Sequence, residues 1–220
     1  RIAYVQGDLP EAQGHFQHAL HLAEQHGQEE DVLSQLNNLA ILQMERGQYE
    51  AAEVYYRQVL ARSEAANYSL GVAMATGNLG IVALERSSLD EAERFFQKAE
   101  RLYQELNNWE AQASNLGNLG LVAGRRGHHH RAVACYQQAL ALMRQVNNPP
   151  GIFLYLNNLG DSSARLGELN LAKSYYQQAL ALAEQLGAPV GQAQAFSGLG
   201  NVAQDQGRYN EAQVCFEQAL

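Results

Sequence analysis

Residues 156–180 read LNNLGDSSARLGELNLAKSYYQQAL, and this stretch decides the fold because the rest of the chain repeats it. Forty residues earlier, positions 116–140 read LGNLGLVAGRRGHHHRAVACYQQAL, and the pattern continues at steps of 40 in both directions without insertion or deletion. The 220 residues hold about 5.5 such repeats. A fixed period of this length predicts an architecture in which each repeat contacts mainly its neighbours.

Each repeat is predicted to form two helices. In residues 113–126, Leu116, Leu119 and Ala123 recur at three- and four-residue spacing, which places them on one apolar face of a helix, and residues 130–146 show the same periodicity. Glycine returns in mid-helix at positions 80, 120, 160 and 200. Since a mid-helix glycine costs roughly 1 kcal/mol relative to alanine, its return indicates close packing.

The predicted turns are as periodic as the helices. Nearly all of them carry glycine or asparagine, which tolerate positive φ at a helix C-terminus. These residues are Gly7, Gly27, Gly47, Asn67, Asn107, Gly127, Asn147, Gly167, Gly187 and Gly207. Ser87 is the exception. The helices are therefore expected near residues 1–6, 9–26, 29–46, 49–66, 69–86, 89–106, 110–126, 129–146, 150–166, 169–186, 189–206 and 209–220.

Short connections predict antiparallel helix pairs. The predicted fold is all-α, a right-handed α-solenoid superhelix forming one array over residues 1–220. Its helix pairs are 1–26 (partial), 29–66, 69–106, 110–146, 150–186 and 189–220 (truncated). Because the chain starts and stops inside a repeat, we expect a fragment of a longer array.

Composition narrows the class of protein. A net charge of −8 argues against general affinity for nucleic acid or anionic membrane. No apolar run reaches the ~20 residues of a membrane span, and the first residues do not show the pattern of a signal peptide. Cys135 and Cys215 occupy one position in repeats two steps apart, too far for a disulfide, so both are expected to be reduced core residues in a cytoplasmic protein.

The repeat resembles the tetratricopeptide signature, in which Leu-Gly in the first helix precedes Ala, Phe and Ala in the second. The matching residues are Leu79, Gly80, Ala92, Phe96 and Ala99. At 40 rather than 34 residues, and without the usual proline, the repeat is similar to those of kinesin light chains (residues 36–40 with 47–52) and of Pins/LGN adaptors (185–187 through 198–201). The same long repeat also occurs in the sensor arms of bacterial signalling NTPases and transcription regulators.

The resemblance implies a concave groove, lined by the first helix of each repeat, that binds an extended peptide or a partner helix. Carried over position by position, the groove residues are Asn38, Asn78, Asn118, Asn158, Ile41, Ile81, Leu121, Arg125, Arg165 and Asn201. An Asn side chain can pair with any peptide backbone, so the Asn row is a candidate backbone clamp. Alternatively, these Asn side chains bond neighbouring helices or water and only set the repeat geometry.

Charge varies along the same row. Glu45 and Glu85 precede Arg125 and Arg165, which predicts a groove that is acidic at its N-terminal end and basic in the middle. Because Arg suits bidentate carboxylate contacts, the partner is expected to carry acidic residues near Arg125 and Arg165. The alternative is a solvated surface with incidental charges.

The run His128-His129-His130 is interpreted as a solvated turn, because consecutive residues point in different directions and metal ligands on a helix are spaced by three or four. No cofactor, metal site or enzyme motif is expected. The predicted function is a protein-binding scaffold. Two alternatives are a regulatory arm in a larger signalling protein and end-to-end self-association through uncapped ends.

Overall fold

The computed structural model describes residues 9–220, so the helix expected at residues 1–6 and the turn at Gly7 lie outside the described residues. Contacts divide the chain into two compact units, which we call unit 1 and unit 2, on either side of Asn107–Asn108. Unit 1 contains α2 (Leu9–Gln25), α3 (Glu29–Glu45), α4 (Tyr49–Ala65), α5 (Ser69–Glu85) and α6 (Leu89–Glu105). Unit 2 contains α7 (Trp109–Arg125), α8 (His129–Gln145), α9 (Pro149–Arg165), α10 (Leu169–Gln185), α11 (Pro189–Asp205) and α12 (Tyr209–Gln218).

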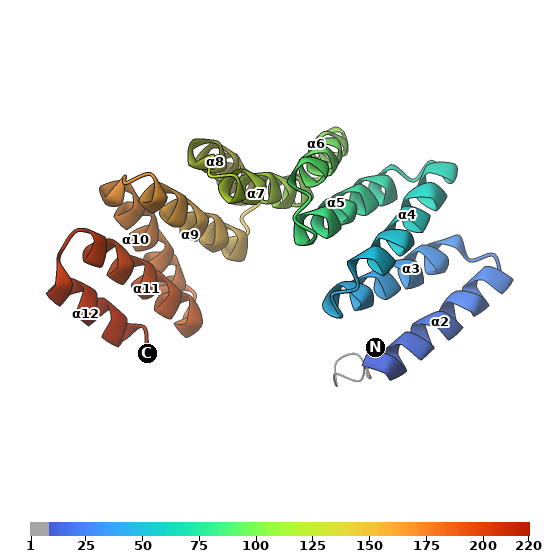
Figure 1. Cartoon of the computed structure of the whole chain (residues 1–220), viewed down its shortest axis with the longest axis horizontal. Coiled ribbons are helices and arrows are strands. Elements are labelled where there is room, and N and C mark those ends of the chain that lie inside the picture. Colours follow the sequence, from blue (N-terminus) through green and yellow to red (C-terminus); the bar gives the residue numbers. More distant parts are fainter. Residues whose placement is uncertain (1–8) are drawn as a thin grey trace. The chain divides into compact units, whose positions relative to one another are not determined.

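The described residues are all-α, as the periodicity predicted. Within each unit, consecutive helices run antiparallel and pack against their neighbours in chain order (Figure 1). Helices α2 to α11 each have 17 residues and are joined by three-residue turns, so that two helices and two turns make the 40-residue repeat. Among these helices, none is both long and apolar enough to cross a membrane.

Turns within each unit share one hydrogen-bonding pattern. At the α3–α4 turn, the Gln48 backbone N–H donates to the Gln43 carbonyl at 2.8 Å, and Gly47 between the helices has φ +68°. This is the Schellman arrangement, which requires a left-handed residue. Ser87, the exception in sequence, adopts the same conformation at φ +59°. The predicted left-handed asparagines at 67, 107 and 147 are confirmed, with φ of +52° to +53°.

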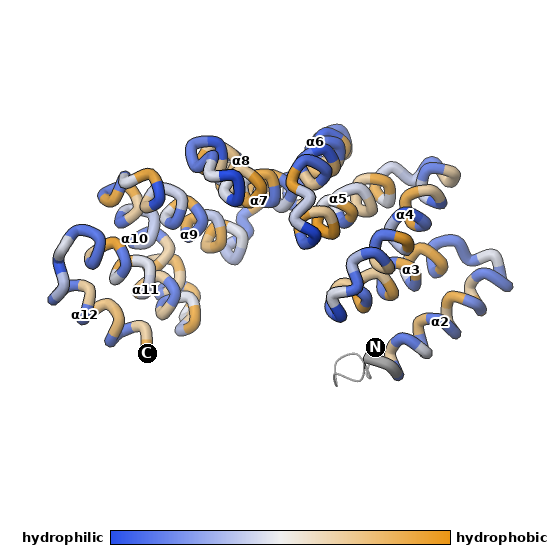
Figure 2. The backbone as a smooth tube through the Cα atoms, viewed as in Figure 1, coloured by the Kyte–Doolittle hydropathy of each residue, from blue (hydrophilic) through white to orange (hydrophobic). Residues whose placement is uncertain are grey.

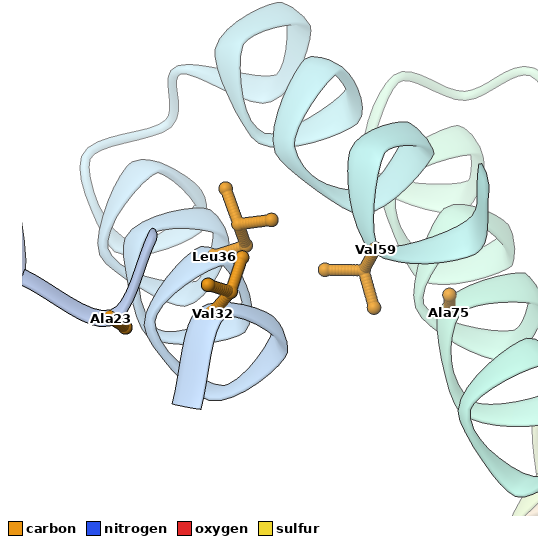
Figure 3. Close-up of a cluster of buried hydrophobic side chains, with 5 residues drawn as sticks. All are labelled: Ala23, Val32, Leu36, Val59 and Ala75. Atoms are coloured by element: carbon orange, nitrogen blue, oxygen red, sulfur yellow. The ribbon is translucent and has the colours of Figure 1, made fainter. Parts of the chain in front are cut away.

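Apolar residues gather where consecutive helices of a unit meet. Along each tube in Figure 2 hydrophobic and hydrophilic positions alternate, as expected of helices that bury one face. In unit 1 one buried cluster joins four helices through Ala23, Val32, Leu36, Val59 and Ala75 (Figure 3). Burial of this shared face is what makes each repeat depend on its neighbours.

The mid-helix glycines allow the close packing that the sequence predicted. A Cβ placed on Gly80 or Gly120 would lie 2.6 Å from the Phe96 ring or 2.5 Å from the Tyr136 ring. The same holds for Gly160 beside Tyr176. One aromatic ring from the second helix of the repeat therefore rests directly on the backbone of the first.

A pair of substitutions in α7 tests this packing. Gly120→Ala is expected to destabilise unit 2 by about 1–2 kcal/mol, because overpacking outweighs the gain of roughly 1 kcal/mol in helix propensity. Gly124→Ala is the matched control: apart from the adjacent backbone of its own helix, nothing lies within 4 Å of its added Cβ, so the propensity gain remains and the variant is expected to be stabilised. Urea unfolding of both variants measures the difference, and equal effects would contradict the packing argument.

Candidate functional site

Each first helix of a repeat exposes one four-residue stripe, spaced i, i+4, i+7 and i+11, which lies along one helix face. The stripes are Ser34, Asn38, Ile41 and Glu45 in α3; Met74, Asn78, Ile81 and Glu85 in α5; Ser114, Asn118, Leu121 and Arg125 in α7; Leu154, Asn158, Asp161 and Arg165 in α9; and Gln194, Gly198, Asn201 and Asp205 in α11. The third and fourth positions are exposed in every stripe, and the four asparagines at the second position are half-buried. The predicted groove residues thus occupy equivalent positions.

In unit 2, two stripes meet at one pocket of about 380 Å³. Leu121, Gly124 and Arg125 come from the last turns of α7. His129 and Tyr136 come from one face of α8. Residues Asn158, Asp161, Ser162 and Arg165, spaced i, i+3, i+4 and i+7, come from one face of α9. We call this hollow the α7–α9 pocket.

The charged groups of the α7–α9 pocket are two arginines and one aspartate. Arg125 and Arg165 each lie in the last turn of their helix, where the helix dipole stabilises a cation. With Asp161, the lining carries a formal charge of +1 when His129 is neutral. A guanidinium can hold a carboxylate by two parallel hydrogen bonds, so this lining is suited to an anionic group.

The side chain of Asp161 is held by a hydrogen bond from the next helix. The phenol O–H of Tyr176 in α10 donates to Asp161 Oδ1 at 2.5 Å, and Tyr176 itself is buried beside Gly160. Burial raises the pKa of Tyr176, and the hydrogen bond to Asp161 and the charge of its carboxylate add to this rise. Burial likewise raises the pKa of Tyr136 to about 12, with smaller contributions from Cys135 and Asp161. Both phenols therefore remain neutral donors at physiological pH.

The asparagines of the stripes differ in their bonding. Asn78 Nδ2 donates to Asn37 Oδ1 of the preceding repeat at 3.3 Å, whereas Asn38 Nδ2 lies 3.5 Å from Gln35 Oε1 on its own helix. Asn158 lines the α7–α9 pocket. The bond at Asn78 fits the reading in which asparagine sets repeat geometry, while Asn158 belongs to the lining of a pocket.

The structure brings together only some of the predicted groove residues. Leu121, Arg125, Asn158 and Arg165 share the α7–α9 pocket, while Asn201 lies exposed on α11 outside it. Asn38 and Ile41 line a different hollow of about 600 Å³ in unit 1, between α2 and α3. The remaining residues of that hollow are His15, Phe16, Ala19, Ser34 and Gln35.

Five lining residues of the α7–α9 pocket are not among the predicted groove residues listed above: Gly124, His129, Tyr136, Asp161 and Ser162. Tyr136 reads in sequence as a core aromatic, and it is indeed 6% exposed, but its edge reaches the pocket. One sequence signal could have found the Asp161–Tyr176 bond. Each stripe's third residue lies 15 positions before the ring of its repeat, and only this pair combines a carboxylate with a phenol.

Histidine and cysteine are the side chains that most often bind transition metals. Among residues 9–220, no three His, Cys, Asp or Glu side chains gather where they could hold a metal ion. Neither Cys135 nor Cys215 forms a disulfide, but both are half-buried, so the expectation that they are core residues was wrong.

Comparison with solved structures supports the fold. BtubC (BKLC) from P. vanneervenii is similar over 96% of this chain and 89% of its own, with 21% identity and a TM-score of 0.86. A putative kinesin light chain of Podosopora anserina is similar over 85% of this chain and 92% of its own, with 17% identity and a TM-score of 0.73. The STAND protein with a tetratricopeptide repeat sensor from Pyrococcus horikoshii matches 86% of this chain with 22% identity and a TM-score of 0.77, and this chain covers 29% of it.

Comparison with curated protein sequences gives no significant match. Tetratricopeptide repeat profiles, in contrast, match residues 71–145 and 152–220, and a second such profile matches residues 32–67. These matches cover well over half of the sequence and follow the 40-residue register seen in the helices. The chain belongs to the tetratricopeptide repeat family.

Proposed function

We propose that this chain is a protein-interaction scaffold whose α7–α9 pocket receives an acidic group on an extended segment of a partner protein. The observation that carries the proposal is the convergence of Arg125 and Arg165, from two successive repeats, on one pocket. The tetratricopeptide fold itself suggests protein–protein interaction. Its stacked helices offer a preformed surface, which lowers the ordering cost of binding on the protein side.

The lining gives each part of such a segment a contact. Arg125 and Arg165 supply planar donors for a carboxylate. Asn158 supplies an amide that can both donate to and accept from the peptide backbone. Leu121, 40% exposed, supplies apolar area for a neighbouring side chain. An acidic residue beside an apolar one is therefore the pattern that this pocket fits.

A charge-reversal experiment tests the proposal. Arg125→Glu with Arg165→Glu is expected to lower affinity for acidic peptides selected against the wild-type chain by more than tenfold, because two attractive contacts become repulsive. The matched control is Arg131→Glu with Arg144→Glu, which makes the same charge change on exposed positions of α8 outside the pocket. Fluorescence anisotropy measures the affinity of both variants. An equal loss of affinity in the two would show that net charge, and not the pocket, determines binding.

A second candidate function is a regulatory arm that gates a neighbouring domain. It is favoured by the similarity to the Pyrococcus horikoshii protein, whose tetratricopeptide repeats are described as a sensor. In that case the α7–α9 pocket would bind a signal whose arrival changes the activity of an attached domain. A nucleotide-binding or DNA-binding domain in the same full-length protein, with activity altered by Arg125→Glu and Arg165→Glu, would separate this function from simple scaffolding.

A further inference from the structure

We propose that the outer face of α6 (Figure 1) is a docking surface for an acidic helix of a partner protein. Arg94, Lys98 and Arg101 are spaced i, i+4 and i+7, so they lie along one side of α6. All three are exposed, and they lie opposite the side that buries Ala92 and Phe96. We call these three residues the α6 basic face. It belongs to the second helix of a repeat, whereas the α7–α9 pocket is lined mainly by first helices.

The positive charge of this face occurs in one repeat only. The residues at the same positions of the other repeats include no arginine and no lysine: Gly14, Val54, Ala134, Ser174 and Val214; His18, Gln58, Gln138, Gln178 and Gln218; and His21, Ala61, Ala141 and Ala181. Since the other repeats fold without these cations, the repeat architecture does not require them. The charge of the α6 basic face is therefore a feature of this chain that calls for another role.

The other arginines in the described part of unit 1 hold this chain's own side chains. Each contacts an amide or carboxylate oxygen: Arg46 contacts Gln13, Arg57 contacts Glu53, Arg62 contacts Glu24 and Glu29, and Arg86 contacts Glu50 and Glu53. The side chains of Arg94 and Arg101, in contrast, form no hydrogen bond or ion pair with any of residues 9–220. Their planar donors are thus free to hold a carboxylate of another molecule.

Lys98 adds a third cation that is held only loosely. Its Nζ lies 3.9 Å from Oε1 of Glu64 in α4, and the two side chains are 55% and 53% exposed. An exposed ion pair of this kind contributes little to stability. A carboxylate from a partner can therefore take the place of Glu64 at small cost.

A hollow of about 330 Å³ follows the α6 basic face. Its lining comes from α6 alone and consists of Arg94, Gln97, Lys98, Arg101, Leu102 and Glu105. The half-buried Leu102 adds apolar area, and the three cations with Glu105 give the lining a formal charge of +2. Because Glu105 lies at the C-terminal end of the face, it would repel a fourth acidic residue there, which limits the acidic cluster that fits.

The surroundings of the α6 basic face have the opposite charge. Residues 1–107 hold 16 acidic and eight basic residues, whereas residues 108–220 hold seven of each, so the entire net charge of −8 falls in unit 1. With a Debye length of about 8 Å at physiological ionic strength, a compact acidic cluster on this face is attracted mainly by the adjacent cations. A long polyanion such as nucleic acid or an anionic membrane is repelled by the rest of unit 1. The charge distribution therefore favours a protein partner with a short acidic cluster.

Spacing indicates that the partner segment is a helix. A rise of 1.5 Å per residue places Lys98 about 6 Å and Arg101 about 10.5 Å beyond Arg94 along the α6 axis. Acidic residues at j, j+3 and j+7 of an antiparallel helix, or at j, j+4 and j+7 of a parallel one, reproduce these intervals. An extended peptide presents side chains on one side every 6.6–7 Å, so it matches only two of the three cations. The occupant is therefore a helix with three acidic residues along one face.

The test is selection of ligands by the whole chain from a phage-displayed library of alanine-based peptides of about 20 residues, long enough to form a helix, with one helix face randomised. Peptides with Asp or Glu at j, j+3 and j+7 or at j, j+4 and j+7 are expected to be enriched, and to bind more weakly at high salt. Arg94→Gln with Arg101→Gln, confirmed as folded by circular dichroism, is expected to reduce their affinity about five- to tenfold in fluorescence anisotropy.

The matched control is Gln17→Glu with Gln218→Glu, which makes the same change in net charge at exposed positions of α2 and α12. Its affinity for the selected peptides is expected to stay within twofold of wild type. A peptide of the same composition, with its acidic residues moved to j, j+2 and j+5, is expected to bind the wild-type chain at least fivefold more weakly. Equal binding of the two peptides would contradict recognition of a helix face.

Arg125→Glu with Arg165→Glu separates the α6 basic face from the α7–α9 pocket. This variant is expected to keep the selected helices bound. Loss of binding in it, with none in Arg94→Gln with Arg101→Gln, would overturn the proposal and assign the peptides to the pocket. The proposal would also be overturned by equal effects of the α6 and control variants, or by a selection that enriches no acidic helix face.

Discussion

Raising the pH from 10 to 12 is expected to remove several kcal/mol from the free energy of unfolding. Burial raises the pKa of Tyr56, Tyr136 and Tyr155 to about 12, against about 10 for an unfolded tyrosine. Between these values the folded chain keeps phenol protons that the unfolded chain has lost. Stability is therefore fully present below pH 10 and falls as pH rises through the folded pKa.

The size of this loss follows from the shift. A pKa that is higher by two in the folded chain corresponds to roughly 2–3 kcal/mol for one tyrosine. Tyr56 lies in unit 1, and Tyr136 and Tyr155 lie in unit 2, so both units are expected to lose stability. All three are at most 6% exposed, so solvent screening weakens the effect little. Urea unfolding at a series of alkaline pH values, with tyrosinate absorbance recorded in parallel, measures stability and ionisation together. Tyrosinate formation before unfolding would contradict the predicted order.

Tyr56→Phe provides the control in unit 1. Phenylalanine keeps the ring that packs with Ala52 and Leu79 but has no proton to lose. The variant is expected to remain near wild-type stability below pH 10 and to lose roughly 2–3 kcal/mol less between pH 10 and 12. An alkaline loss as large as that of the wild type would assign the effect to other groups.

Most of the fold could be predicted from the 40-residue period of the sequence. A 40-residue period with positive-φ residues at fixed places predicted the ends of α2 to α11 within one residue, for example Glu45 instead of residue 46, while α12 ends two residues earlier than predicted. It also predicted why Gly120 recurs, since only glycine leaves room for the Tyr136 ring. Ser87 shows that the repeat position predicts the turn conformation better than the residue type does. Serine adopts a positive φ there, although most turns carry glycine or asparagine.

The functional surfaces could be predicted only in part. Sequence placed Arg125 and Arg165 at one stripe position, and the structure adds that both line one pocket. The 15-residue offset in sequence pairs Asp161 with Tyr176, but the period does not specify the helix packing that brings the two side chains within bonding distance. The concentration of negative charge in unit 1 required knowing where the units divide. Side-chain contacts between repeats, rather than helix existence, are what sequence periodicity leaves undetermined.

Phe96→Ala is expected to destabilise unit 1 by about 3–5 kcal/mol, the cost of removing a fully buried phenylalanine. The ring is 0% exposed and rests against Gly80, where glycine leaves no side chain that could move into the space. The neighbouring helices are joined by turns of only three residues, which limit how far they can move. The cavity left by the Phe96 ring can therefore close only partly. Thermal or urea unfolding monitored by circular dichroism measures the loss.

Phe216→Ala in α12 is the matched control, because Phe216 occupies the same repeat position and rests on Gly200 in the same way. Since Phe216 is only half-buried and lines an open hollow, its removal is expected to cost roughly half as much or less. Hydrogen exchange then locates each effect. In an array whose repeats depend mainly on their neighbours, Phe96→Ala is expected to raise exchange first in α5 and α6, while α10 and α11 keep wild-type protection. Uniform loss of protection along the chain would instead show that units 1 and 2 unfold as one cooperative body, and the two proposed surfaces would then share a single stability.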